Sequence, residues 1–386
     1  MPTILLPSAD RRLVPYTTEP PRAFPPASPP FSRIAYAAAH VVADPLADIS
    51  PWLEAAIDWD ATLAYRHHLW SLGLAVAEAM DTAQRGMGLD WPMARELIRR
   101  SAAAAKATAG AVLACGAGTD HLAPSPTLTL RDVIAAYEEQ VAAVEAVGAR
   151  VILMASRALA AVARGPDDYR EVYGRILAQV SQPVIIHWLG EMFDPALAGY
   201  WGSRDVHQAM EACLSVLHAH AAKIDGIKIS LLDKELEIAM RRRLPLGVRM
   251  YTGDDFHYAE LIAGDGTHHS DALLGIFDAI APAASAALDR LTRGDVAAFH
   301  DILAPTVPLS RAVFAAPTRF YKTGVVFLAW LNGHQGHFVM LGGQQSARSL
   351  LHLAELFRLA DRAGLLRDPD LACARMRTLL ALHGVA

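Results

Sequence analysis

Residues 223–233 read KIDGIKISLLD, a short apolar run with a lysine at its centre. Isoleucine favours a β-strand, and successive side chains of a strand point to opposite faces. Gly226, Lys228 and Ser230 would therefore share one face, and the isoleucines would form the other. Lysine is rarely buried without a partner. Lys228 either extends to solvent or pairs with Asp233, or burial lowers its pKa so that the amine acts as a nucleophile.

Longer amphipathic stretches separate this run from seven similar ones. Residues 128–148, for example, carry apolar side chains at helical spacing and end at Gly148, a helix stop signal. Strands that alternate with helices predict an α/β fold of βαβ units, and eight of them predict a closed (β/α)8 TIM barrel. Working groups of such barrels lie at the C-terminal ends of the strands, so Lys228 would point inward. The predicted strands lie within residues 33–42, 73–80, 110–118, 149–156, 182–190, 224–232, 245–253 and 268–277.

The chain outside the barrel is of two kinds. Residues 1–31 are dense in proline, which disfavours helices and central strands, and they predict an irregular arm on the surface. Residues 32–282 would form the barrel. Residues 283–386 have helical patterns without a strong strand, which predicts a C-terminal helical extension. The aromatic-rich residues 316–338, which include Lys322, would join this extension to the barrel or one subunit to another.

The composition is that of a globular protein with a sizeable core, because 53% of the 386 residues are hydrophobic and 19% are charged. A net charge of -5 without a basic block argues against nucleic acid as a partner. No targeting segment and no run long enough to cross a bilayer are visible, so we expect no membrane partner. Three widely spaced cysteines form neither a disulfide framework nor a CxxC metal pair, which is typical of the reducing cytoplasm.

Four segments carry a family resemblance. They are GLAVAEAMDTAQRGMGLDW (73–91), QPVIIHWLG (182–190), DGIKIS (225–230) and MYTGDDFH (250–257). Their order resembles the dihydrodipicolinate synthase/N-acetylneuraminate lyase superfamily of class I aldolase TIM barrels, and more closely an uncharacterised dihydrodipicolinate-synthase-like branch. The resemblance covers about residues 32–365. It implies that Lys228, in a Gly-x-Lys strand, forms a Schiff base.

The resemblance also implies an activity. A class I aldolase or lyase, or a dehydratase, would act on a small keto acid or sugar-derived carbonyl compound without a cofactor. The lysine amine attacks the carbonyl, and the protonated imine then withdraws electrons from a breaking bond. The carbonyl substrate is the expected partner, and we expect a homo-oligomer, either a dimer or a tetramer.

Substrate-binding side chains are expected in the loops that follow the strands. Thr82 and Arg85 stand where the family has its Gly-Thr-Thr-Gly-Glu loop, and an arginine presents a rigid fork to a carboxylate. Asp254 and Asp255 match the family's Gly-(Asp/Asn)-Asp loop. The alternative for Arg85 is a turn residue that extends to solvent.

The family's tyrosine relay at the end of the fourth strand is absent. Ser156 and Arg157 stand there, and Ser156 would contact the substrate. His187 replaces a Tyr-Asn motif in the fifth strand, and the near-neutral pKa of a histidine makes it the candidate proton relay, with Arg157 nearby. A lone histidine in a strand can equally be a core residue.

Two other functions stay open. A metal-dependent barrel enzyme could use the carboxylates and imidazoles after the seventh strand, although their spacings match no closed-site signature, so we assign no metal ligand. The other alternative is a barrel that binds a ligand without catalysis. The side chains of the metal alternative are Asp254, Asp255, His257, His268 and His269.

Overall fold

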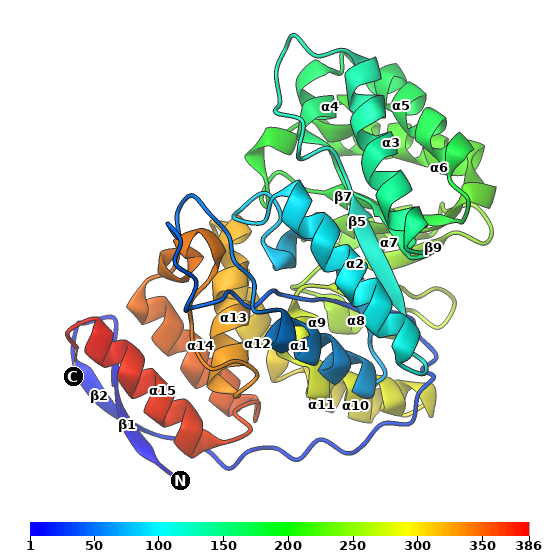
Figure 1. Cartoon of the computed structure of the whole chain (residues 1–386). Helices are drawn as coiled ribbons and strands as arrows, with labels where there is room; N and C mark the ends of the chain where they lie inside the picture. The colour runs from blue at the N-terminus through cyan, green and yellow to red at the C-terminus, as the bar shows by residue number, and fades with distance from the viewer. Residues whose placement is uncertain (386) are drawn as a thin grey trace.

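Eight parallel strands form a closed barrel in the structure, a computed structural model that describes residues 1–385. The strands follow chain order around the barrel, and the last pairs with the first (Figure 1). Each predicted run contains one strand, which confirms the (β/α)8 TIM barrel. The strands are β3 (Ala35–Ala38), β4 (Ala75–Glu78), β5 (Leu113–Ala117), β6 (Arg150–Leu153), β7 (Val184–Leu189), β8 (Ile224–Ser230), β9 (Arg249–Thr252) and β10 (Asp271–Leu274).

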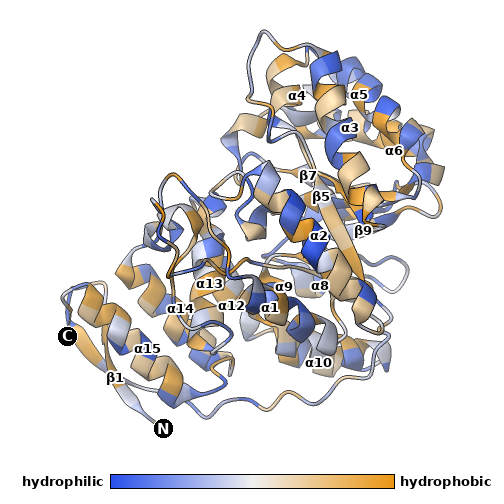
Figure 2. Cartoon of the chain, in the orientation of Figure 1, coloured by the Kyte–Doolittle hydropathy of each residue, from blue (hydrophilic) through white to orange (hydrophobic). Residues whose placement is uncertain are grey.

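Helices follow the strands and cover the outside of the barrel. Helix α2 begins where the Asp90 side chain accepts a hydrogen bond from the backbone N–H of Met93, and α3 begins at a capping box of Thr129 and Asp132. Polar and apolar segments alternate along these helices in Figure 2, as expected for helices with one buried face. The helices are α1 (Trp59–Ser71), α2 (Trp91–Ala107), α3 (Leu130–Ala146), α4 (Arg157–Val162), α5 (Pro166–Gln179), α6 (Val206–Ala219), α7 (Lys234–Arg241), α8 (Tyr258–Ala263) and α9 (Ile276–Ala279).

The barrel wall separates two apolar layers. Ile227 and Ile229 belong to the layer between strands and helices, whereas Tyr251 belongs to a smaller cluster inside the barrel. Lys228 of β8 pairs in register with Tyr251 of β9, so both side chains face the interior. A Cβ atom at Gly226 would lie 2.6 Å from a ring carbon of Tyr251, so only glycine leaves room for that ring. Lys228 therefore points inward, as the alternation predicts.

A helical extension follows the barrel. Helix α13 is buried along its whole length and contacts α9, α12, α14 and α15. Its first residue, Tyr321, reaches the barrel and forms a hydrogen bond with Thr82. The extension contains α10 (Ala281–Thr292), α11 (Val296–Leu303), α12 (Thr306–Val313), α13 (Tyr321–Leu331), α14 (Leu350–Arg362) and α15 (Pro369–Leu382). Short 3-10 helices include η1 (Asp81–Ala83), η2 (Pro195–Leu197), η3 (Tyr200–Gly202), η4 (Ala221–Lys223), η5 (Thr318–Phe320) and η6 (Leu341–Ser346).

The N-terminal arm is more regular than predicted. Strands β1 (Thr3–Pro7) and β2 (Leu13–Thr17) form an antiparallel hairpin, and β1 packs on α14 and α15 (Figure 1). The prediction of irregular structure is wrong here, because both strands of a two-stranded sheet are edges, where proline is tolerated. Tyr16 anchors the hairpin with a 2.7 Å hydrogen bond to Asp361. Residues 18–31 contain no helix or strand.

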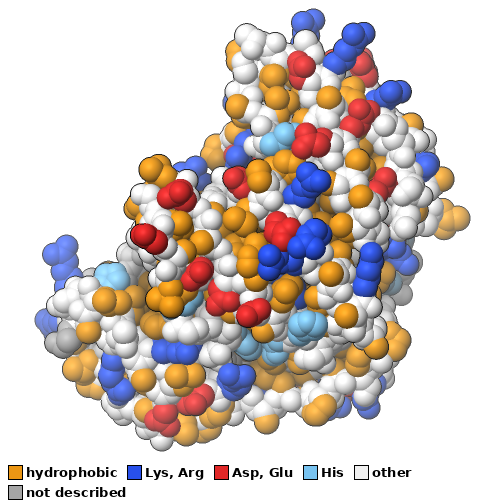
Figure 3. Space-filling view, in the orientation of Figure 1, with side chains coloured by type: hydrophobic (Ala, Val, Ile, Leu, Met, Phe, Trp, Pro, Cys, Tyr) orange, Lys and Arg blue, Asp and Glu red, His pale blue; other side chains and the backbone are white. Residues whose placement is uncertain are grey.

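The surface is mixed in charge. Acidic and basic side chains are interspersed on the face that Figure 3 shows, as expected for a chain with 35 basic and 40 acidic residues. No helix within residues 1–385 combines the length and the apolar character that a membrane span needs.

Candidate active site

Lys228 lies inside the barrel, and its side chain is 7% exposed. It runs along the backbone of Gly253, where a Cβ atom would lie 2.7 Å from its Cε. Burial lowers the pKa of the Lys228 amine, while the charges of Asp81 and Asp255 act against this lowering. No hydrogen bond among residues 1–385 involves its Nζ, and Asp233 instead caps α7. The amine therefore does not pair with Asp233.

Two neighbouring carboxylates after β9 have different surroundings. Asp254 accepts hydrogen bonds from the backbone N–H groups of Phe256 and His257, and it pairs with Nδ1 of His257 at 2.9 Å. Asp255 instead accepts a 2.9 Å hydrogen bond from the backbone N–H of Ile276 and interacts with the charge of Lys228. Burial raises the pKa of Asp255 to about 7, although Lys228 lowers it. Asp254 thus shapes the loop, and Asp255 is the carboxyl group whose charge acts on Lys228.

His187 faces the interior beside the lysine. It pairs in register with Lys228, and its Nε2 lies 3.2 Å from Oγ of Ser230. Burial, and then the charge of Lys228, lower the pKa of His187 well below its ordinary value. The near-neutral pKa expected for a relay is therefore not observed, and this imidazole stays neutral.

A tyrosine from the extension reaches the barrel site. The hydroxyl of Tyr321 lies 2.7 Å from Oγ1 of Thr82 in η1. The ring of Tyr321 stacks on Phe314 at a centroid distance of 4.4 Å, which fixes its orientation. Burial raises the pKa of this phenol well above 10, as do the charges of Asp81 and Asp255. Thr82 is thus held by Tyr321, 239 residues further along the chain.

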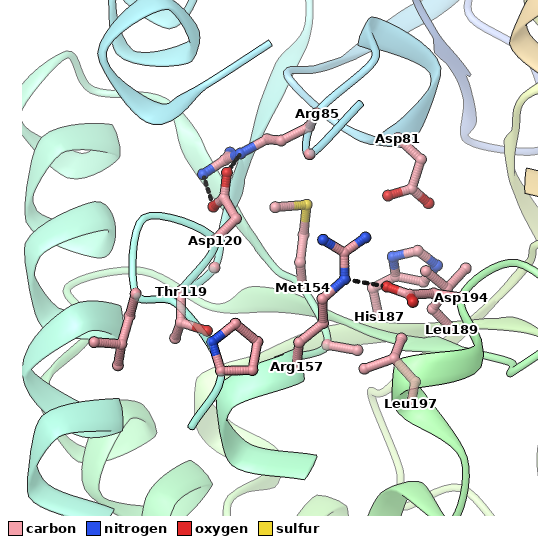
Figure 4. Close-up of a pocket in the computed structure, with 15 residues that line it drawn as sticks. Asp81, Arg85, Thr119, Asp120, Met154, Arg157, His187, Leu189, Asp194 and Leu197 are labelled. Atoms are coloured by element: carbon pink, nitrogen blue, oxygen red, sulfur yellow. Dashed lines mark hydrogen bonds and ion pairs between the residues drawn. The ribbon is translucent and has the colours of Figure 1, made fainter. Parts of the chain in front are cut away.

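A cavity of about 80 Å³ lies at the mouth of the barrel (Figure 4). It reaches His187 and Asp81 but does not include Lys228 in its wall, so the lysine lies just beyond these two residues. Met154, directly after β6, lies between the two ion pairs that Figure 4 shows. The wall consists of Asp81, Arg85, Gly86, Gly118, Thr119, Asp120, Leu122, Pro124, Met154, Ala155, Arg157, His187, Leu189, Asp194 and Leu197.

Arg85 is bound within the protein. Its guanidinium forms a bidentate pair with Asp120 at 2.8 and 3.0 Å. Its remaining N–H groups donate to the carbonyls of Ala79 and Gly116 and to the side chain of Gln140. All five donors of the fork are therefore used within the protein. Arg85 shapes the wall of the cavity, and no donor is left for a substrate.

Ser156 and Arg157, which follow the fourth barrel strand, differ in whether they line the cavity. Ser156 caps α4, because its Oγ accepts a hydrogen bond from the backbone N–H of Leu159, and it also lies 2.6 Å from the hydroxyl of Thr119. The structure does not bring Ser156 to the cavity. Arg157 does line the cavity. Its Nε pairs with Asp194, and its two terminal nitrogens point into the open space (Figure 4).

A smaller cavity of about 30 Å³ adjoins the first and shares five lining residues with it: Asp81, Arg85, Arg157, Leu189 and Asp194. Lys322, the second residue of α13, forms part of its wall and is 4% exposed. Its Nζ donates to Sδ of Met87 and to the carbonyl of Arg319, both at 3.2 Å. Burial lowers the pKa of Lys322 to about 8, although Asp81 raises it.

The carboxylates and histidines of the metal alternative do not form one cluster. Asp254 pairs with His257, whereas the charge of Asp255 interacts with that of Lys228. The backbone of His268 is held by Asp265 in a separate loop. Within the described part of the chain, no three His, Cys, Asp or Glu side chains are arranged to hold a metal ion.

Three side chains at the mouth are not predicted by the sequence pattern: Asp81, Tyr321 and Lys322. A signal exists for Asp81, which precedes Thr82 and stands in place of the other threonine of the family's Thr-Thr pair. The pair Tyr321–Lys322 follows Arg319 and Phe320 in a segment that reads only as a packing region. Its contact with η1 depends on the tertiary fold.

The chain is similar in fold to solved dihydrodipicolinate synthases. The enzyme from Aquifex aeolicus matches with a TM-score of 0.65 and 13% identity, over 87% of this chain and 100% of that chain. YagE, a prophage protein of the dihydrodipicolinic acid synthase family from E. coli K12 in complex with pyruvate, matches with a TM-score of 0.62 and 14% identity, over 92% and 99%. The chloride-inhibited synthase from Acinetobacter baumannii complexed with pyruvate gives 0.62 and 14%, over 86% and 99%. This likeness confirms the fold that the resemblance implies.

No curated protein matches the sequence. A family model with the description "Protein of unknown function (DUF993)" matches residues 4–385, which is nearly the whole chain. The chain therefore belongs to the DUF993 family, and it has the fold of the dihydrodipicolinate synthases.

Proposed function

We propose that the protein is a class I lyase or aldolase that forms a Schiff base between Lys228 and a small carbonyl compound such as a keto acid. The position of Lys228 carries the proposal: its amine is buried near the C-terminal end of β8, inside a barrel, with a lowered pKa. Two solved proteins of similar fold hold pyruvate, which is a keto acid. Their fold supports the proposal without identifying the substrate.

The neutral amine attacks the carbonyl carbon and forms a C–N bond. The carbonyl oxygen leaves as water with both amine protons, and protonation of the resulting imine gives an iminium ion. The iminium nitrogen accepts the electron pair of an adjacent breaking C–C or C–H bond. The resulting enamine takes up a proton or a carbonyl carbon at its carbon atom, which regenerates the iminium ion. Addition of water to this iminium ion then releases the product and restores Lys228. Aldol cleavage, aldol condensation and dehydration all pass through this intermediate.

Asp255 is the proposed acid–base group of the reaction. A pKa of about 7 leaves both forms populated at neutral pH, which is the condition under which a carboxyl group both gives and takes protons. The hydroxyl pair of Thr82 and Tyr321 supplies a second route for a proton. His187 stays neutral and orients Ser230 and the cavity wall. Its replacement by asparagine should therefore lower turnover only severalfold.

Borohydride trapping tests the proposal. Purified protein is incubated with candidate keto acids and sodium borohydride, and peptide mass spectrometry locates the adduct. Hydride adds to the imine carbon and leaves a stable secondary amine, so we expect one substrate-sized mass increase on the peptide that contains Lys228. Lys228→Ala should remove the adduct, and Lys322→Ala, which removes the other buried amine of the mouth, should retain it at a saturating concentration of the keto acid.

The opposite pattern contradicts the proposal. An adduct on surface lysines alone, or none with any keto acid that the protein binds, would favour a barrel that holds its ligand without catalysis.

The assembly and the location predicted from the sequence remain proposals. Light scattering on the purified protein checks for the expected dimer or tetramer, and fractionation of the producing cells checks the expected cytoplasmic location.

A further inference from the structure

The two cavities at the mouth have an unequal set of charges. The N–H groups of Arg85 already donate hydrogen bonds to Asp120 and to neighbouring groups. Asp194 is already paired with Nε of Arg157. After these pairs are set aside, the basic groups outnumber the acidic ones in the remaining wall. Three charged groups remain without a charged partner: the amine of Lys322, the guanidinium of Arg319 and the carboxylate of Asp81. The terminal nitrogens of Arg157 also remain without a hydrogen bond.

Arg157 is built to receive an anion. The Nε–Asp194 pair fixes the plane of its guanidinium, while the two terminal nitrogens point into the larger cavity (Figure 4). No hydrogen bond among residues 1–385 involves these two nitrogens. Two parallel N–H groups in one plane match the two oxygens of a carboxylate or a phosphate.

Lys322 adds a second donor from a different element. It is buried at the start of α13, and its hydrogen-bond acceptors are the Met87 sulfur and the Arg319 carbonyl, neither of which carries a charge. An ammonium ion that is buried without a bonded anion is costly. Lys322 lines the cavity that adjoins Arg157, so one anionic group could neutralise both.

We propose that Arg157 and Lys322 form an anion subsite, which binds a carboxylate or phosphate group remote from the carbonyl that reacts with Lys228. The inference rests on the proposed function and adds the substrate class, an acyclic carbonyl compound with an acidic group at its far end. Asp81 lines both cavities, and its charge acts on both Lys228 and Lys322.

Titration calorimetry on the full chain tests the subsite with two probes that lack a carbonyl: glutarate for a carboxylate and inorganic phosphate for a phosphate. The probe that binds more tightly shows whether the acidic group of the substrate is a carboxylate or a phosphate. Arg157→Gln and Lys322→Met should each weaken it at least about tenfold. Lys322→Arg, which retains the charge, should stay within about threefold of the wild type. If Lys322→Met does not fold, as judged by its melting curve, Arg157→Gln decides alone.

A pH series with glutarate provides an independent readout. The charged groups that face Lys322 are Asp81, Arg157, Asp194 and Arg319. Lys322 loses its proton around pH 8, so glutarate binding to the wild type should weaken across this range. Binding to Lys322→Arg should not.

Two outcomes overturn the subsite: neither probe binds, or binding is unchanged in both Arg157→Gln and Lys322→Met. Repeating the titration with Lys228→Ala separates this result from the Schiff base. If glutarate binding survives in Lys228→Ala and the wild type traps no keto acid, the result supports the anion subsite and contradicts the lyase function. If the wild type traps a keto acid but binds neither anion, the result supports the lyase function and contradicts the subsite.

Discussion

Lys228 and Lys322 are both buried at the barrel mouth, and burial lowers the pKa of both amines. Lys322 donates to a sulfur and a carbonyl, so its amine is held in place as a donor. Lys228 has no such acceptor, and only the charges of Asp81 and Asp255 act on it. The difference shows that burial alone does not assign a role to a lysine. An amine that is held by acceptors serves binding, and one that lacks them is available for attack on a carbonyl.

Replacing each lysine by arginine should distinguish the roles of the two residues, and Lys228→Arg should cause the largest loss of activity. Guanidinium stays protonated and forms no imine, so Lys228→Arg should lose trapping and lower turnover about a thousandfold or more. Lys322→Arg retains the positive charge and should keep trapping and most of the turnover. Initial rates and borohydride adducts of both variants check this. Equal losses in the two variants would end the distinction between a nucleophilic and a binding lysine.

Asp255→Asn should give the next largest effect, because Asp255 acts on Lys228 and not on Lys322. Turnover should fall about a hundredfold, as expected for the loss of an acid–base group, while trapping persists. The wild-type kcat profile should bend near pH 7, where the Asp255 carboxyl titrates, and the variant profile should not. A bend that persists in the variant would transfer the acid–base role to another group.

Tyr321→Phe tests whether the extension contributes more than Lys322. The change removes the hydrogen bond to Thr82, and a hydrogen bond worth about 1.4 kcal/mol corresponds to about tenfold in rate. Turnover should fall by this factor without loss of trapping. Tyr16→Phe, which removes an equally short hydrogen bond in the hairpin, should leave the rate unchanged. A normal rate in Tyr321→Phe would reduce the tyrosine to a packing residue.

Asp81→Asn should have the smallest effect and should act on both lysines. The Asp81 carboxylate raises the pKa of both amines, so its removal should lower both pKa values further. The pH midpoints of trapping and of glutarate binding should then both move to lower pH, each by less than about one unit. Trapping rates and calorimetry across pH 6 to 10 measure the two midpoints. A shift in one midpoint alone would place Asp81 beside only one of the lysines.

The barrel could be predicted because its signals are local. Each strand is a short apolar run, and alternation within residues 224–230 suffices to turn Lys228 inward. The hairpin was missed because Pro7 and Pro15 argue against strands, although an edge tolerates them. Local sequence signals therefore predict well which segments form strands and which face each side chain occupies. They fail for the hairpin, because whether a strand tolerates proline depends on whether another strand pairs beside it.

The candidate site was predictable only in part for the same reason. Arg85 looked like a substrate anchor because its partner Asp120 is 35 residues away and cannot be read from the loop. Ser156 has a local alternative as a helix cap, which the sequence also allowed. The sequence pattern predicts a relay in the barrel strands and gives no signal for Tyr321, whose contact with Thr82 brings in a residue of α13. Contacts between distant elements decide these roles.

The hairpin of β1 and β2 has a consequence for the order in which the chain is made. Tyr16 and its partner Asp361 are 345 residues apart, so β1 and β2, which are synthesised before α14 and α15, can pack only after these helices have been made. The extension that carries Tyr321 and Lys322 is therefore closed by a hairpin that precedes it in synthesis. The barrel strands all precede α13, so the mouth acquires Tyr321 and Lys322 only once synthesis has passed this helix.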